Sequence, residues 1–328
     1  MLRSLIFFTL LSSAWLMAQS LSGSLTQKGG TPNRLFINPA SLLETISDTN
    51  IKTDLLKSSI ILDEPSFKFI KELKDVDNNQ EISKLLKKNI GETLSFSANN
   101  FSSISQNREN TAWSLGVAHT LDGYFITHSG FGSKRAMETF VESYRAFIGT
   151  LVLNKENTTY GVNLKLLEKS KTVYNYAITE IANQSVSDYF DNEHTKKEQA
   201  FGLDMGVVYS LPQNSLNTKL SLAFLNIGNT SFKELGRLNN RTNIGFSVEP
   251  QKTLIQVDYL HDNLRVDVSK NFFNNHLELH SGIIYNALSL GFNYQFSIFN
   301  IGLHSYKIEE PYTQNKERKY DLSIALSW

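Results

Sequence analysis

The sequence predicts an all-β protein, a transmembrane, antiparallel, up-and-down β-barrel, from three observations. Apolar and polar residues alternate strictly over about nine to eleven residues in several segments, the length that a tilted strand needs to cross a bilayer. Turn residues separate these segments. No run of 18 apolar residues follows the first twenty, which excludes membrane-spanning helices but not barrels. Because soluble sandwiches also alternate, the prediction depends on segment length and repetition.

Composition narrows the function classes. The chain has 328 residues, with 32 Lys and Arg against 32 Asp and Glu. This balance gives no reason to expect nucleic acid as a direct partner, or an acidic ligand. The chain contains no cysteine. Lipoprotein attachment, a disulfide framework and thiol chemistry are therefore excluded.

Residues 1–18 have the parts of a secretory signal peptide. Arg3 supplies the positive region, residues 5–11 the apolar region, and Ala18 a cleavage site before Gln19. The alternative is a short N-terminal anchor helix, but Ser12 and Ser13 shorten the apolar run. We therefore expect export through the Sec pathway.

Residues 19–47 are polar and contain glycine, with one compact element, RLFINPASLLE. Residues 48–328 carry the barrel pattern, interrupted at 63–90 by helical spacing of apolar residues. Pro65 suits a first helical turn and Gly91 a helix end. We expect this insertion to be an amphipathic cap that packs its own apolar face. The alternative is a hydrophobic landing surface for a ligand, formed by Phe67, Phe69 and Ile70.

The candidate strands from residue 48 onward number about sixteen. An even number places both ends of the barrel on one side, which is periplasmic in bacterial barrels. The longer polar connections then fall together on the outer side, at 184–199, 227–240 and 308–317. The tight links at 212–215 and 249–251 fall on the periplasmic side.

The last stretch, KYDLSIALSW, is the most regular strand of the chain. Its alternate residues are apolar: Tyr320, Leu322, Ile324, Leu326 and Trp328. We expect these side chains to face lipid, with Trp328 at the membrane–water boundary, where aromatic rings are favoured. Ser323 and its polar neighbours would point inward.

Several stretches together resemble the FadL-type outer-membrane family. They are RLFINPASLLE near the mature N-terminus, LSLAFLNIGNTSF at 220–232, and KIEEPYTQNKERKYDLSIALSW at the end. The nearest likeness is to the subgroup named after the TraF protein of plasmid-transfer operons and to PorV-like barrels. Thioredoxin-like TraF proteins need a redox cysteine pair, so the absence of cysteine excludes that activity here.

The resemblance implies a barrel of fourteen strands in the outer membrane of a Gram-negative bacterium. Segments 48–62 and 122–129 are the two doubtful strands among the sixteen. It also implies that residues 19–47 form a hatch inside the barrel, with Asn38, Pro39 and Ala40 in the lumen. The closing strand resembles the signal that the barrel assembly machinery recognises. Outer-membrane lipids and this machinery are therefore the expected partners, with a hydrophobic small-molecule ligand as a third.

Polar residues opposite the apolar stripes are the candidates for lining the lumen. They are Asn163, Lys165, Asp204, Arg265, Asp267, Glu278, Asn293 and Gln295. In a soluble sandwich this face would meet bulk solvent. In a barrel it faces the interior, where opposite charges hold side-chain networks or the hatch in place.

No motif predicts catalysis, a metal or a cofactor. His276 and His280 share a strand face, but four residues along a strand span roughly 13 Å, too far for one ion. HExxH, phosphate-loop and nucleophile-elbow motifs are absent from the sequence. We therefore expect a protein that is not an enzyme.

Two functions remain open. The resemblance implies a passive channel for hydrophobic or poorly soluble small molecules. The alternative is an envelope barrel without transport, which anchors or shuttles secreted proteins or serves a conjugation or secretion apparatus. The sequence leaves the ligand, the partner proteins and the oligomeric state undetermined.

Overall fold

The computed structural model describes residues 38–45, 51–74, 79–129, 137–176, 195–212, 215–260, 263–284, 286–309 and 316–327. Residues 1–18 lie outside this part, as does most of the 19–47 segment. The helical elements are η1 (Pro39–Ser41), α3 (Leu42–Thr45), α4 (Glu64–Leu73), α5 (Asn79–Lys88) and η3 (Pro250–Lys252). The strands are β1 (Ile51–Asp63), β2 (Thr93–Arg108), β3 (Thr111–Thr127), β4 (Met137–Lys155), β5 (Thr158–Tyr176), β6 (Thr195–Ser210), β7 (Lys219–Leu225), β8 (Thr230–Ser231), β9 (Arg237–Leu238), β10 (Arg241–Val248), β11 (Thr253–Leu260), β12 (Asn263–Phe272), β13 (Leu277–Ile284), β14 (Ala287–Phe296), β15 (Phe299–Glu309) and β16 (Lys316–Ser327).

Fourteen of these strands form a closed antiparallel barrel, in which each strand pairs with its neighbours along the chain. The barrel closes where β1 pairs with β16, for example at Ser59 and Ser323. Strands β8 and β9 form a separate two-stranded sheet in the chain segment that connects β7 to β10, and β7 and β10 themselves pair directly in the barrel. The predicted up-and-down barrel is therefore confirmed.

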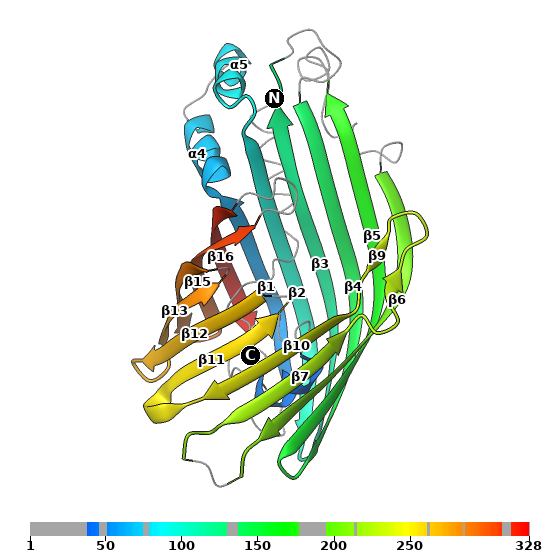
Figure 1. The fold of residues 1–328 in the computed structure, drawn as a ribbon, viewed down its shortest axis with the longest axis vertical. Helices are drawn as coiled ribbons and strands as arrows, with labels where there is room; N and C mark the ends of the chain where they lie inside the picture. Colours follow the sequence, from blue (N-terminus) through cyan, green and yellow to red (C-terminus); the bar gives the residue numbers. More distant parts are fainter. Residues whose placement is uncertain are drawn as a thin grey trace.

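The two sides of the barrel differ in height (Figure 1). Strands β2 to β6 are 16–19 residues long. Strands β7 and β10 to β14 have only 7–10 residues. Helices α4 and α5 lie at the upper end of the barrel.

The strand number agrees with the family resemblance and corrects the raw count of sixteen. Of the two doubtful segments, one is a strand of the barrel and the other is not a separate strand. Residues 51–63 form β1, which pairs on both sides and closes the barrel. Residues 122–127, by contrast, belong to β3, because the ladder between β3 and β4 runs without a break from Thr111 to Thr127. Alternation of side chains cannot reveal that two short patterns belong to one long strand.

The barrel wall has exposed apolar side chains on one face and buried, largely polar side chains on the other. In β5, Leu164 and Leu166 are exposed, whereas Asn163 and Lys165 are buried. The same alternation holds in the shorter wall, where Leu264 is exposed and Arg265 is buried. A soluble protein buries its apolar side chains, so this arrangement is the reverse of a soluble sandwich. It is the arrangement expected of a barrel surrounded by lipid.

Connection length differs between the two ends of the barrel. The start of β1 and the end of β16 lie at one end, together with short links such as 109–110, 156–157 and 249–252. The opposite end carries α4 and α5 and the long connections 177–194, 226–240 and 310–315, with two-residue links only at 261–262 and 285–286. The predicted asymmetry is confirmed. However, β6 already begins at Thr195, earlier than the predicted connection 184–199 allowed.

The helical insertion forms as predicted. Asp63 caps α4 by accepting a hydrogen bond from the Ser66 backbone N–H at 2.7 Å, and Pro65 stands in the first turn. Gly91 has a φ of 82°, which a glycine adopts without strain. Phe69 is buried with Leu73, Leu85 and Leu94, so it is not available as a landing surface, whereas Phe67 is exposed.

None of the described helices has the length and apolar character that would let it cross a membrane.

The closing strand β16 follows the predicted pattern in the part that the structure describes. Leu322 and Ile324 are exposed and Asp321 is fully buried. Tyr320 and Leu326 are half-buried, and Trp328 lies outside the described residues. Lys319 lies 3.8 Å from Asp63 at the end of β1, so the capping residue of α4 also joins the two strands that close the barrel.

Candidate functional site

The inner face of β5 and β6 contacts two segments that are not strands of the barrel wall. The ladder between these strands pairs Gly161 with Gly206, Asn163 with Asp204, Lys165 with Gly202, Leu167 with Ala200 and Lys169 with Glu198. Residues two apart along a strand share a face, so these five pairs form one inward-facing strip.

The Asn-Pro-Ala segment lies against the first pair. A Cβ atom on Gly161 would stand 2.6 Å from the Cα atom of Ala40, and one on Gly206 would stand 2.9 Å from the Cγ atom of Asn38. Both glycines therefore permit a close approach that a larger residue would prevent. Asn38, Pro39 and Ala40 are all buried, with none of Asn38 or Ala40 exposed.

Asn38 organises this segment locally and fixes it to the wall. Its side-chain oxygen accepts the Ala40 N–H at 3.0 Å, and its backbone oxygen accepts the Ser41 hydroxyl at 2.7 Å. Its side-chain amide donates to the backbone oxygen of Val207 at 3.3 Å. A capping residue, a proline in the first turn and a small residue thus produce the helical turn η1.

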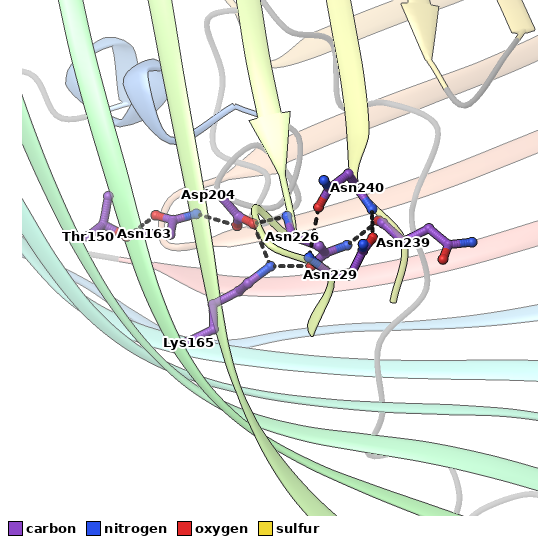
Figure 2. Close-up of polar contacts among 8 residues, drawn as sticks. All are labelled: Thr150, Asn163, Lys165, Asp204, Asn226, Asn229, Asn239 and Asn240. Atoms are coloured by element: carbon purple, nitrogen blue, oxygen red, sulfur yellow. Dashed lines mark hydrogen bonds and ion pairs between the residues drawn. The ribbon is translucent and has the colours of Figure 1, made fainter. Parts of the chain in front are cut away.

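A buried polar network follows at the next two pairs (Figure 2). Lys165 Nζ lies 2.6 Å from Asp204 Oδ1, and the side chains are 8% and 0% exposed. Asn163 connects Asp204 to Thr150 of β4 through hydrogen bonds of 3.3 Å and 2.8 Å. Because these groups satisfy one another, the charges are compensated inside the barrel.

The same network holds the start of the connection 226–240, which joins β7 to β10. Asn226 donates its backbone N–H to Asp204 at 2.9 Å and accepts Lys165 Nζ at 2.9 Å. Asn229 and Asn240 exchange two hydrogen bonds of 2.9 Å, each from a backbone N–H to a side-chain oxygen (Figure 2). Both ends of the connection are therefore fixed by asparagine side chains.

Between its ends the connection turns into the barrel. Phe232 and Leu235 are buried in one apolar cluster with inward residues of β2 to β5 and with Leu42 of α3. Phe232 packs edge-on against Tyr144 of β4, with ring centroids 6.2 Å apart. Lys169 Nζ lies 5.1 Å from the centre of the Tyr144 ring and 5.8 Å from that of Phe232.

A second polar cluster lies on the shorter wall, between β12 and β15. His280 lies 3.3 Å from Glu278 and 3.7 Å from Asp267. Asn293 bonds His280 at 2.9 Å and His304 at 3.2 Å. Arg265 is buried and pairs across the ladder with Asp258. Of the eight predicted lumen residues, Asn163, Lys165 and Asp204 thus meet in one network, and Asp267, Glu278 and Asn293 in another.

Gln295 differs from the other predicted lumen residues, because it is exposed near the end of β14. Among the described residues no group of three or more His, Cys, Asp or Glu could hold a metal ion. The apolar cluster that contains Phe232 lies on the same inward strip as two ion pairs, Lys165 with Asp204 and Lys169 with Glu142.

Several residues of the site were not predicted from the sequence. Gly161 and Gly206 interrupt strand patterns, and a glycine in a strand can signal close approach of another backbone. Asn226 and Phe232 lie in the LSLAFLNIGNTSF stretch, but their spacing does not show that they enter the barrel. Tyr144 and Lys169 carry no signal that a single sequence reveals.

No protein-family model and no curated protein matches this chain. Several solved structures are similar to it in fold. The TodX deltaS2S3 mutant, a monoaromatic hydrocarbon channel, superposes with a TM-score of 0.61 at 11% identity, covering 95% of this chain and 97% of its own. The toluene transporter TbuX of Ralstonia pickettii gives 0.57 at 11% identity, with 90% and 93% covered. The toluene transporter TodX of Pseudomonas putida gives 0.56 at 10% identity, with 96% and 98% covered.

The likeness is one of fold. It covers 90–96% of the chain, so the barrel has the fold found in these structures. The TraF-type and PorV-like subgroup stays a prediction.

Proposed function

We propose that this chain is a FadL-like channel in the outer membrane of a Gram-negative bacterium, through which hydrophobic or poorly soluble small molecules pass passively. The observation that carries the proposal is the content of the barrel. Residues 38–45 and 226–240 enter a closed barrel without being strands of its wall. Segments of this kind can move while the wall stays intact, which is what a gated channel requires.

The outer face supports the proposed location. In β4 and β5, exposed Leu151, Leu153, Leu164 and Leu166 form a continuous apolar surface. Above them, Arg145 and Glu168 approach each other at 3.7 Å on the same face. A band of apolar side chains that ends at a charged pair is expected where a barrel leaves the hydrocarbon region.

The interior supports an apolar cargo. The apolar cluster that contains Leu42 and Phe232 joins the two inserted segments to inward residues of β2 to β5. The structural neighbours TodX and TbuX are described as toluene transporters. By analogy of fold, the cargo proposed here is a hydrophobic small molecule, and the Asn-Pro-Ala segment acts as a hatch.

The test is uptake by purified protein in lipid vesicles. Heat-modifiable migration on electrophoresis would first show that the barrel has assembled. Vesicles that contain the protein should then take up a small hydrophobic solute faster than protein-free vesicles. An assembled barrel that transports none of a panel of such solutes would contradict the proposal. The alternative role, in which the barrel anchors or shuttles secreted proteins, has no structural observation in its favour.

A further inference from the structure

We propose that Phe232 occupies the binding site of a single-ring aromatic ligand, and that such a ligand displaces Phe232 together with its connection. The inference deepens the proposed function and rests on it, because it names the class of cargo. The inference is based on where the contacting residues lie in the fold. Tyr144 and Lys169, which contact the ring directly, are strand residues, whereas the ring itself belongs to a connection.

The environment of Phe232 is specific for an aromatic ring. Its side chain is 2% exposed and meets the Tyr144 ring at an interplanar angle of 61°. Edge-to-face packing of this kind is favoured by the charge distribution of two aromatic rings. Lys169 Nζ, 5.8 Å from the ring centre, adds a cation–π contact. An aliphatic chain in the same place would gain neither interaction.

The site does not depend on Phe232 for its electrostatic balance. Glu142 lies 3.0 Å from Lys169 Nζ and accepts the Tyr144 hydroxyl at 2.7 Å. All three residues belong to β4 and β5, which are paired along their whole length. If Phe232 left, the lysine would keep its counter-ion and the tyrosine its hydrogen bond. The aromatic site is therefore already formed by the wall.

Phe232 can leave the cluster without loss of barrel pairing. Strand β8 has two residues and pairs only with β9, and the Phe232 backbone N–H donates to Gly236 within the same connection. Near Phe232 two side chains of β6 hold the connection. Glu198 accepts the N–H groups of Glu234 and Leu235, and Lys196 pairs with the Glu234 carboxylate at 2.6 Å. Phe101, in the same cluster, differs: it lies in β2 and pairs with β1 and β3.

The identity of the displaced group defines the ligand class. Toluene has the structure of a phenylalanine side chain, so a ligand of this size and shape can take the place of Phe232 with the least rearrangement. In the present conformation Phe232 competes with that ligand. The apparent affinity of the site is lowered by the fraction of molecules in which Phe232 fills it.

Binding of 4-fluorotoluene to purified barrels in lipid nanodiscs, followed by ¹⁹F NMR, tests the competition. If the vacated state has a population of about a tenth or less, Phe232→Ala should bind roughly tenfold or more tightly than wild type. Phe232→Leu, which restores part of the packing, should lie between them. Phe101→Ala is the matched control, since it opens a hole in the same cluster without removing the competitor. Equal gains in Phe232→Ala and Phe101→Ala would overturn the proposal, as would no gain in Phe232→Ala.

A second experiment leaves Phe232 in place and restrains the connection. Lys196 of β6 and Glu234 of the connection form an exposed pair 2.6 Å apart, and the chain has no native cysteine. In Lys196→Cys/Glu234→Cys, a short reducible bis-methanethiosulfonate cross-linker should abolish 4-fluorotoluene binding, and a reductant should restore it. Each single variant, treated with a monofunctional reagent, should bind as wild type does. Undiminished binding by the cross-linked barrel would refute displacement.

The two proposals fail in different ways. A wild-type barrel that transports aliphatic solutes, but whose ring binding is unaffected by cross-linking or by Phe232→Ala, would disprove only the aromatic site. A barrel that transports nothing, yet binds 4-fluorotoluene in competition with Phe232, would disprove only the channel.

Discussion

The side chain of Asn38 fills the space that a Cβ atom on Gly206 would need: its Cγ atom lies 2.9 Å from that position. The two residues are far apart in sequence, and a hydrogen bond from Asn38 to the neighbouring Val207 reinforces the contact. The fit of the Asn-Pro-Ala segment against the wall therefore depends on the absence of a side chain at one position of β6.

Substitution Gly206→Ala should displace the Asn-Pro-Ala segment while leaving the barrel assembled. The added methyl group overlaps Asn38, and overpacking of this kind costs about 1–3 kcal/mol. The measurement is single-channel conductance or solute leak in vesicles, with assembly checked by heat-modifiability. Gly149→Ala is the control, because its Cβ would meet only Leu115 Cδ2 at 3.7 Å. Identical permeability in the two variants would show that the segment does not respond to this contact.

Deletion of residues 38–40 should leave the barrel assembled, because strand pairing and lipid contacts provide its stability. We expect permeability to small hydrophobic solutes to change, either by a leak or by loss of the ligand's resting place. A Gly-Ser-Gly replacement of the three residues keeps the chain length and should behave like the deletion. An assembled deletion variant with unchanged permeability to every solute tried would favour a purely structural segment.

Ile324→Arg should impair assembly severely, since Ile324 is exposed on the apolar face of β16. A charge on the lipid face costs about 2–4 kcal/mol near the membrane midplane and less at the interface. Ser323→Arg should be milder, because residue 323 shares the inward face with the buried Asp321. The heat-modifiable fraction in outer-membrane preparations measures both effects. Equal damage from the two substitutions would contradict this assignment of faces.

Asp204→Ala should destabilise the barrel by about 3–5 kcal/mol, because it leaves the Lys165 charge buried without its carboxylate. Lys165→Met should have a similar effect. The double variant Lys165→Met/Asp204→Ala should lose less than the two single losses combined, since no lone charge remains. Urea unfolding in nanodiscs gives the three values. Additive losses would show that the two side chains do not interact energetically.

Much of the wall could be predicted because its signals are local. Alternation with a period of two marks a strand wherever Leu164 and Lys165, or Ile324 and Ser323, face opposite ways. Pro65 and Gly91 bound the helical insertion through their own backbone preferences. Segment 48–62, which contains most of β1, was a doubtful strand for a physical reason. This strand is defined by pairing with β16 at the far end of the chain, and no local pattern records such a partner.

The sequence by itself determined the fold class, the inward and outward faces, and the position of the helical insertion, because each depends on residues close together in the chain. Only the tertiary structure decided which residues meet inside the barrel. Gly206 receives Asn38, Asp204 receives Asn226, and Tyr144 receives Phe232. These contacts depend on strand register and on barrel closure, which are collective properties of fourteen paired strands.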